Sequence, residues 1–203
     1  MTRNLSMGAR SIVLVLVASL ASLLGCAGTA PSRYYGLSPM PASESTPSKE
    51  SRPFTVGVAR VTLPEFLDRP QIATRVGPHE VRYDEFNRWA EPLKENISGV
   101  LAENLCSLIG PDRVISSSGA GALTADYHVW VEVIRFDAGP GGDFSLAAQW
   151  SLYNHEKKKV VVRKRFNTQE QANGSDYVAM TAAASKALAA LSREIAEGIK
   201  NLP

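Results

Sequence analysis

The residue with the clearest chemical role in this sequence is Cys26, which ends the run Leu23-Leu24-Gly25-Cys26. A cysteine thiolate is a strong nucleophile and can accept a lipid group through its sulfur. Gly25 has no side chain, so a peptidase can approach the bond that precedes the cysteine closely. These residue types predict that Cys26 is lipidated and that the chain is cut just before it.

The residues before this cysteine have the layout of a secretory signal peptide. Arg3 and Arg10 supply a positive beginning, and residues 11–24 form an apolar run. That run is shorter than the roughly 20 residues that a membrane-spanning helix requires. The segment resembles the bacterial lipobox, and we expect residues 1–25 to be removed as a lipoprotein signal peptide. The alternative is an ordinary signal peptide in which the cysteine occurs by chance.

A lipidated Cys26 also predicts where the protein resides. Each buried CH₂ group of an acyl chain contributes about 0.8 kcal/mol, and one chain alone anchors only marginally, so several chains are needed for a durable anchor. Ala27 follows the cysteine, whereas an aspartate there would favour retention in the inner membrane. We therefore expect a protein that is anchored to the outer membrane by lipid and faces the periplasm.

Charge and cysteine content narrow the classes of partner. The formal net charge is +2, and Arg3 and Arg10 are the only charged side chains in residues 1–25, so the rest of the chain is balanced. A balanced chain argues against nucleic acid as the main partner. Once Cys26 carries lipid, Cys106 is the only other cysteine, which excludes an intramolecular disulfide. Its place in a helical pattern favours a small core residue, with a reactive thiol as the alternative.

Other residues that could do chemistry do not form a recognisable site. His128, Trp130 and Glu132 share one face of a predicted strand. The ends of this group lie about 13 Å apart at the rise of a strand, which is too far to bind one metal ion. The sequence contains no Walker loop, GxSxG, HExxH or CxxC motif. We therefore expect no enzymatic activity, no cofactor and no metal site.

Residues 26–53 have the composition of a tether that follows the lipidated cysteine. Five prolines and many serines lie in this stretch, which is typical of a linker. Fully extended at roughly 3.3 Å per residue, it could reach about 90 Å. The exception is Tyr34-Tyr35-Gly36-Leu37, because two aromatic residues in a polar tether favour docking on a domain, as an edge strand for example.

Residues 54–203 predict one periplasmic domain with both helices and strands. Seven strands are indicated by β-branched or alternating apolar residues at 54–61, 71–76, 80–83, 113–116, 127–136, 144–153 and 160–168. Amphipathic helices are indicated at about 93–108 and about 176–200. The order predicts an α/β (α+β) fold, a two-layer sandwich in which two helices cover one face of a mixed, mostly antiparallel sheet.

The same patterns predict which side chains enter the core. In residues 127–136, alternation places Tyr127, Val129, Val131 and Val133 on one face and Trp130, Ile134 and Phe136 on the other. The first helix presents a stripe made of Leu93, Ile97, Val100, Leu101, Asn104, Leu105 and Leu108.

Four stretches of the sequence carry a family resemblance. They are Tyr34-Tyr35-Gly36-Leu37, Val58-Ala59-Arg60-Val61-Thr62-Leu63-Pro64, Leu67-Asp68-Arg69-Pro70-Gln71-Ile72 and Asn87-Arg88-Trp89-Ala90-Glu91-Pro92-Leu93. They resemble the PqiC-type lipoproteins, also described as ABC-type transport auxiliary lipoproteins, over nearly all of the chain after Cys26. The resemblance implies an outer-membrane anchor, no catalysis and an accessory role in intermembrane lipid transport. It also implies MCE-domain partners that bridge the periplasm.

The last two stretches and the residues between them include a candidate partner-binding patch. Arginine and aromatic residues are enriched at the hot spots of protein–protein interfaces, the few residues that contribute most of the binding energy. The patch consists of Leu67, Asp68, Arg69, Pro70, Arg75, Arg88 and Trp89. The alternative is structural, with Asp68 paired to Arg75 or Arg88 and Trp89 stapling the start of the helix. A combination of both interpretations is open.

These observations lead to one main expectation and two alternatives. The main expectation is a non-enzymatic accessory lipoprotein of an MCE-type lipid transport system, which docks a bridging protein or forms a ring of its own copies as a homo-oligomer. One alternative is a lipoprotein regulator of envelope or peptidoglycan assembly. The other is a carrier that binds lipid in a cavity of its own.

Overall fold

The structure, a computed structural model, describes residues 30–41, 54–115 and 124–202. The described residues from Ser32 onward belong to one structural unit. The predicted signal peptide, Cys26 and residues 42–53 of the predicted tether lie outside the described residues. Within the described part of the chain, no helix has both the length and the hydropathy needed to cross a membrane.

Among the described residues, eight strands form one sheet and two α-helices pack against it. The strands are β1 (Arg33–Tyr35), β2 (Val56–Thr62), β3 (Gln71–Gly77), β4 (Glu80–Trp89), β5 (Val114–Ile115), β6 (Tyr127–Ala138), β7 (Asp143–Asn154) and β8 (Lys159–Gln171). The helices are α2 (Leu93–Ile109) and α3 (Tyr177–Lys200), with a 3-10 turn, η2 (Pro111–Arg113), before β5. The predicted order of elements is confirmed, and the two tyrosines of the tether form the expected edge strand, β1.

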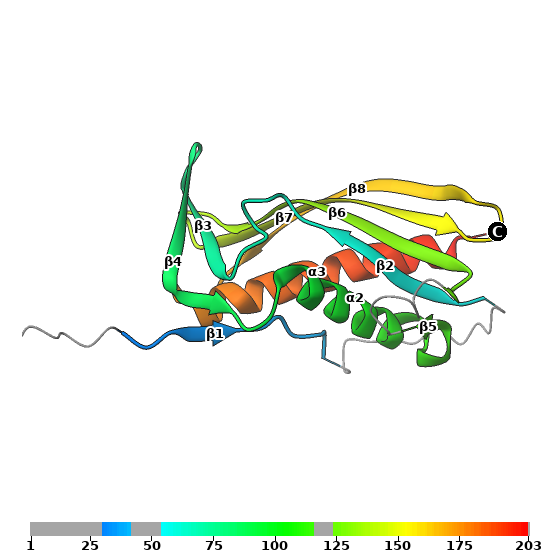
Figure 1. The fold of residues 1–203 in the computed structure, drawn as a ribbon, viewed down its shortest axis with the longest axis horizontal. Helices are drawn as coiled ribbons and strands as arrows, with labels where there is room; N and C mark the ends of the chain where they lie inside the picture. The colour runs from blue at the N-terminus through cyan, green and yellow to red at the C-terminus, as the bar shows by residue number, and fades with distance from the viewer. Residues whose placement is uncertain (1–29, 42–53, 116–123, 203) are drawn as a thin grey trace, which may run out of the picture. The chain divides into compact units, whose positions relative to one another are not determined.

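Strand β6 organises the sheet. It pairs in parallel with β2 on one side and antiparallel with β7 on the other, and β7 pairs in turn with β8. The antiparallel β3–β4 hairpin joins the end of β6 through the pair Thr74 and Ala138, and β1 adds to β4 in parallel. The sheet is therefore mixed, as predicted, and the hairpin and β1 lie together at one end of it (Figure 1).

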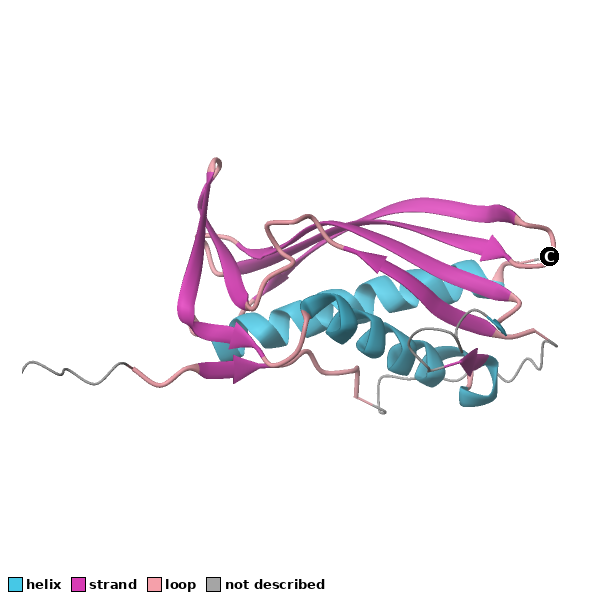
Figure 2. Ribbon diagram, viewed as in Figure 1, coloured by secondary structure: helices cyan, strands magenta, loops and turns pink. Residues whose placement is uncertain are grey.

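Both helices cover the same face of the sheet, as the sequence predicts (Figure 2). Val129 and Val131 of β6 and Leu101 of α2 are buried in the core between the two layers. Helix α3 approaches β7 most closely at Gly198, where any side chain would overlap the indole ring of Trp150. A helix made largely of small residues can lie this close because it leaves room for large side chains from the strands.

One side chain of β6 lies on the face opposite to the predicted one. Alternation predicts Phe136 on the same side as Ile134, but Phe136 is buried in the core, with its ring centroid 4.7 Å from that of Phe144. The cause is a register shift between Val133 and Arg135, because a β-bulge adds a residue and reverses the faces beyond it. Ile134, which precedes the shifted register, is exposed.

Residues 33–41, which the sequence assigns to the tether, pack on the domain, and we name them the N-terminal strap. The main-chain amide of Leu37 donates a hydrogen bond to Oδ1 of Asn96 at 2.7 Å. The amide of Met40 donates to Oδ1 of Asn104 at 2.7 Å. Both strap side chains are buried against the core. The strap is thus fixed to helix α2 at two points, in addition to its pairing with β4.

Candidate functional site

The seven residues of the candidate partner-binding patch are divided between the core and the surface. Leu67 and Trp89 are buried, and the ring centroid of Trp89 lies 6.3 Å from that of Phe136. Buried side chains of this size stabilise the fold through the apolar surface that they remove from water. A partner would therefore meet the surface that Leu67 and Trp89 support, rather than these side chains themselves.

Three consecutive patch residues, Asp68, Arg69 and Pro70, are exposed on the loop between β2 and β3. The carbonyl of Pro70 accepts a hydrogen bond from the amide of Trp89 at 2.8 Å, which joins the end of the loop to the end of β4. The guanidinium carbon of Arg69 lies 4.2 Å from the centroid of the Tyr83 ring, within the range of a cation–π contact. The loop is therefore held to β4 at two consecutive residues and presents its polar groups in a defined conformation.

The ion pairs of Asp68 that the structural alternative predicts are not formed, because Arg75 and Arg88 both pair with other acids. Arg88 donates through Nε to the carbonyl of Glu85 at 2.8 Å and approaches the Glu85 carboxylate at 3.4 Å. Arg75 pairs with Asp137. Asp68 instead lines an open hollow of about 490 Å³ between β2 and the first turns of α2, beside Lys94. Asp68 is thus accessible to a partner from outside.

Arg75 forms part of a buried charge cluster with Asp137 and Arg135. The Asp137 carboxylate is fully buried, and its Oδ2 accepts hydrogen bonds from Nε and Nη2 of Arg75 at 3.2 and 3.0 Å. Its Oδ1 accepts from Nε of Arg135 at 2.7 Å. A buried carboxylate needs such partners because burial removes its hydration. The cluster therefore joins β3 to the end of β6 and fixes the position of Arg75.

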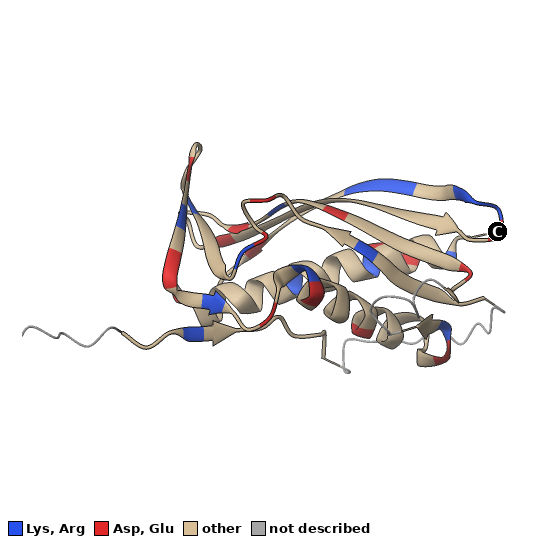
Figure 3. Cartoon of the chain, viewed as in Figure 1, with Lys and Arg blue, Asp and Glu red and all other residues tan. Residues whose placement is uncertain are grey.

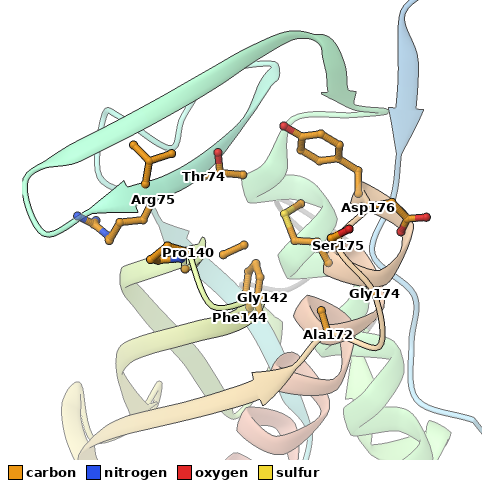
Figure 4. A pocket seen from close by; sticks show the side chains of 14 residues that line it. Thr74, Arg75, Pro140, Gly142, Phe144, Ala172, Gly174, Ser175 and Asp176 are labelled. Atoms are coloured by element: carbon orange, nitrogen blue, oxygen red, sulfur yellow. The ribbon is translucent and has the colours of Figure 1, made fainter.

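Arg75 also lies at the edge of a cavity of about 280 Å³ at this end of the sheet. Figure 4 shows Thr74 and Arg75 of β3 on one side, Pro140 and Gly142 of the β6–β7 turn below, and Asp176 at the start of α3 on the other side. The cavity is small and open, and Phe144 and Met180 contribute to its lining. Its mixture of apolar and polar groups fits contact with a partner or a small ligand better than bond-making chemistry.

A second polar contact lies beside this cavity, between Tyr177 and Asp84. The hydroxyl of Tyr177 donates to Oδ2 of Asp84 at 3.2 Å. Burial, followed by the charge of Asp84 and this hydrogen bond, raises the pKa of Tyr177 to about 12. For Asp84, burial raises the pKa, but hydrogen bonds from the amides of Phe86 and Asn87 and from Tyr177 outweigh it and lower the pKa. The pair fastens α3 to β4.

Charged residues of both signs are spread along the described part of the chain (Figure 3). Two runs of three positive charges are exposed, at residues 157–159 and on β8 at residues 163–165, where Lys164 pairs with Glu194 at 3.2 Å. Within the described ranges, no three His, Cys, Asp or Glu side chains lie close enough together to hold a metal ion. The charged residues described above pair with neighbouring elements or are exposed at the surface.

Sequence reasoning missed several residues that position this surface. Asp137, Asp84 and Tyr177 make their contacts with distant elements, and no local pattern identifies their partners. Asn96 and Asn104 left a clearer signal, because both are polar residues that are buried on the helix face otherwise formed by apolar residues. Buried polar side chains of this kind require hydrogen-bond partners, which here are the amides of the strap.

The family is established by a match that spans most of the fold. The chain belongs to the ABC-type transport auxiliary lipoprotein components, whose family model matches residues 35–196. The match begins in β1 and ends in α3, and the family is one of auxiliary transport lipoproteins that are not known as enzymes. The intermembrane transport lipoprotein PqiC of Escherichia coli K12 is 27% identical over 192 residues, which cover 94% of this chain and 98% of PqiC. PqiC of Shigella flexneri has the same identity and coverage.

Two solved structures share the fold. Protein XCC0632 of Xanthomonas campestris superposes with a TM-score of 0.69 at 18% identity and covers 83% of this chain and 94% of its own. A crystal structure of an uncharacterized protein superposes with a TM-score of 0.68 at 21% identity, covering 84% of this chain and 99% of its own. At these identities the likeness concerns the fold.

Proposed function

We propose that this chain is a non-enzymatic accessory subunit of an MCE-type intermembrane lipid transport system, anchored by lipid to the outer membrane and facing the periplasm. The observation that carries the proposal is the similarity to PqiC, an intermembrane transport lipoprotein, over 94% of this chain. Similarity of this extent includes the strap, the sheet and both helices, and so concerns the whole domain rather than one motif.

The proposed role begins with attachment through Cys26. The thiol stands directly after an apolar run and a glycine, in the order that lipidation requires. The strap begins at Arg33, seven residues later, and is fixed to β4 and α2. The anchor would therefore pull on a segment that is part of the folded domain.

Contact with a periplasmic bridging protein is the second part of the role. The exposed residues Asp68, Arg69 and Pro70 supply both signs of charge on a loop that is held to β4 by two contacts. A surface that is already ordered loses less conformational entropy on binding than a mobile one. We infer that the partner contacts this loop and also Arg88, which lies near the loop, and Arg75, which lies at the edge of the cavity.

A deletion strain tests the proposal. In a strain without paralogues, loss of this protein should increase sensitivity to detergents and membrane-active drugs, and the wild-type gene should restore resistance. Cys26→Ser should fail to restore it, because the protein loses its anchor. Cys106→Ser is the matched control, since it changes the other cysteine, which lies partly buried in α2, and should restore resistance. Unchanged permeability in the deletion strain would contradict the proposal.

Crosslinking in cells separates this role from the regulation of envelope assembly. Capture through the exposed loop should recover an MCE-domain protein. Recovery of a peptidoglycan synthase in its place would favour the regulator instead.

A further inference from the structure

The N-terminal strap and helix α3 enclose a groove of about 500 Å³. Its floor contains Met40 and Ala189, which are buried. Tyr34 on the strap and Val178 and Ala182 on the helix form its rim. Most of the lining is apolar, so the groove and its rim form an apolar surface beside the point where the described chain begins.

Two of the rim residues, Tyr34 and Val178, are unusually exposed for their size. Tyr34 is 64% exposed and Val178 is 65% exposed, which makes them the most exposed large hydrophobic side chains in the part of the chain that the structure describes. The adjacent Tyr35 differs, because its ring packs against Tyr177 and its hydroxyl donates to Oδ1 of Asn87 at 2.8 Å. Packing and hydrogen bonding within the domain therefore account for Tyr35 and leave Tyr34 facing outward.

Positively charged side chains lie in this groove and beside it. Lys186 is the single charged residue in the lining, and Arg33 is exposed immediately before Tyr34. The nearest acid along the helix is Asp176, whose carboxylate is occupied as the cap of α3 and accepts a hydrogen bond from the amide of Ala179 at 2.8 Å. An apolar rim with cations beside it suits the boundary between acyl chains and anionic lipid headgroups.

The short length of chain before the strap determines what this rim can reach. Arg33 is the seventh residue after Cys26, and seven residues span at most about 25 Å when fully extended. Because β1 is fixed to β4, the reach of roughly 90 Å predicted for residues 26–53 is not available to the domain as a whole. A lipid on Cys26 therefore holds Tyr34 close to the membrane surface.

We propose that the groove rim docks on the bilayer that holds the anchor, with Tyr34 and Val178 at the headgroup level and Arg33 and Lys186 against anionic phospholipids. Tyrosine favours this depth because its ring is apolar and its hydroxyl is polar. A lysine on the rim can extend its ammonium group to the headgroups while its methylene stem lies along apolar surface. The inference rests on the proposed lipid anchor at Cys26.

Fluorescence quenching by brominated phospholipids tests this docking. The full lipidated protein is purified and reconstituted in vesicles of phosphatidylethanolamine and phosphatidylglycerol with brominated acyl chains. Tyr34→Trp places a new indole on the rim, and Ile134→Trp is the matched control, since Ile134 is 52% exposed on β6 beside Val133, which is buried in the core. Each variant is compared with the parent protein, whose own tryptophans supply the background.

The outcomes separate the anchor from the docking surface. The added emission at position 34 should fall by more than half in brominated vesicles, while the emission added at position 134 should not change. Flotation of the vesicles reports the anchor: if the wild-type protein does not float with them, the proposed function fails. If the protein floats but position 34 is no more quenched than position 134, the anchor stands and the docking surface is wrong.

Discussion

Gly198 of α3 lies directly against the indole ring of Trp150 of β7, and a β-carbon at position 198 would overlap the ring. Both residues are buried, and the indole cannot move without disturbing the core around it. Gly198→Ala should therefore destabilise the domain by about 1–3 kcal/mol, the usual cost of overpacking a core. Thermal unfolding followed by circular dichroism measures the change.

Gly99→Ala is the control for this substitution. Gly99 also lies within a helix, but it is exposed, and a β-carbon there would meet no atom within 4 Å. Alanine should stabilise helix α2 by about 0.5–1 kcal/mol through its higher helix propensity. Equal effects at the two glycines would contradict the packing explanation.

The buried carboxylate of Asp137 predicts a coupled loss of stability. Arg75→Leu and Arg135→Leu each leave one of its oxygens without its cation, and each should cost about 1–3 kcal/mol. The double variant should cost more than the sum of the single variants, because a buried carboxylate then has neither guanidinium. Urea unfolding gives all three values. Additive losses would mean that the two arginines act independently.

Asn104 predicts how strongly the strap is held. Its Oδ1 accepts from the amide of Met40, and its Nδ2 donates to Oγ of Ser192 at 3.0 Å. Asn104→Leu leaves that amide without its acceptor and should cost about 1–3 kcal/mol. Hydrogen exchange should accelerate at Met40. Asn173→Leu, at an exposed position, should leave the exchange at Met40 unchanged. Equal protection of the Met40 amide in both variants would mean that Asn104 does not hold the strap.

Tyr177 predicts a loss of stability at alkaline pH. Its pKa is raised from 10.0 to about 12 in the fold, so the neutral phenol is favoured. The resulting stabilisation is complete below the pKa of the unfolded chain, near 10.0, and is lost as the pH rises toward 12. Asp84→Asn removes the charge but keeps the burial, so the pKa of Tyr177 should fall and still exceed 10.0. Ultraviolet titration, with Tyr177→Phe to assign the signal, checks this. An unchanged pKa would exclude coupling to Asp84.

Substitution of Arg69 should weaken partner binding with at most a small effect on the stability of the fold. Arg69→Glu reverses an exposed charge on the candidate loop and should weaken binding of the bridging protein about tenfold, or about 1.4 kcal/mol. The free energy of unfolding should fall by no more than about 1 kcal/mol, the usual contribution of an exposed cation–π contact such as that of Arg69 with Tyr83. Arg163→Glu, an exposed position on β8, is the control. Binding that weakens equally in both variants would indicate a general charge effect.

Apolar periodicity predicts the elements well where their contacts are local. The pattern places a helix at about 93–108, and α2 spans Leu93–Ile109. The pattern predicts a strand at residues 80–83, whereas β4 spans Glu80–Trp89. The additional residues pair with β1, which includes Tyr35, 52 positions away from its hydrogen-bond partner Asn87. The local sequence around a residue contains no information about a partner that is so distant along the chain.

The candidate site shows the same limit more strongly. Asn104 in an apolar stripe indicates that a polar partner must exist, but its partners are 64 and 88 positions away, in the strap and in α3. Arg75 is identified by its residue type, but its binding to Asp137, 62 positions later, depends on the sheet topology. Residue types indicated which side chains need partners, and the fold decided which partners they found.

The contact between Ser38 of the strap and Ser185 of α3 joins positions that are 147 residues apart. Synthesis proceeds from the N-terminus, so the strap emerges first and the helix that covers it emerges last. The strap can pair with β4 and bind α2 as soon as those elements have emerged, but its contact with α3 must wait until the chain is almost complete.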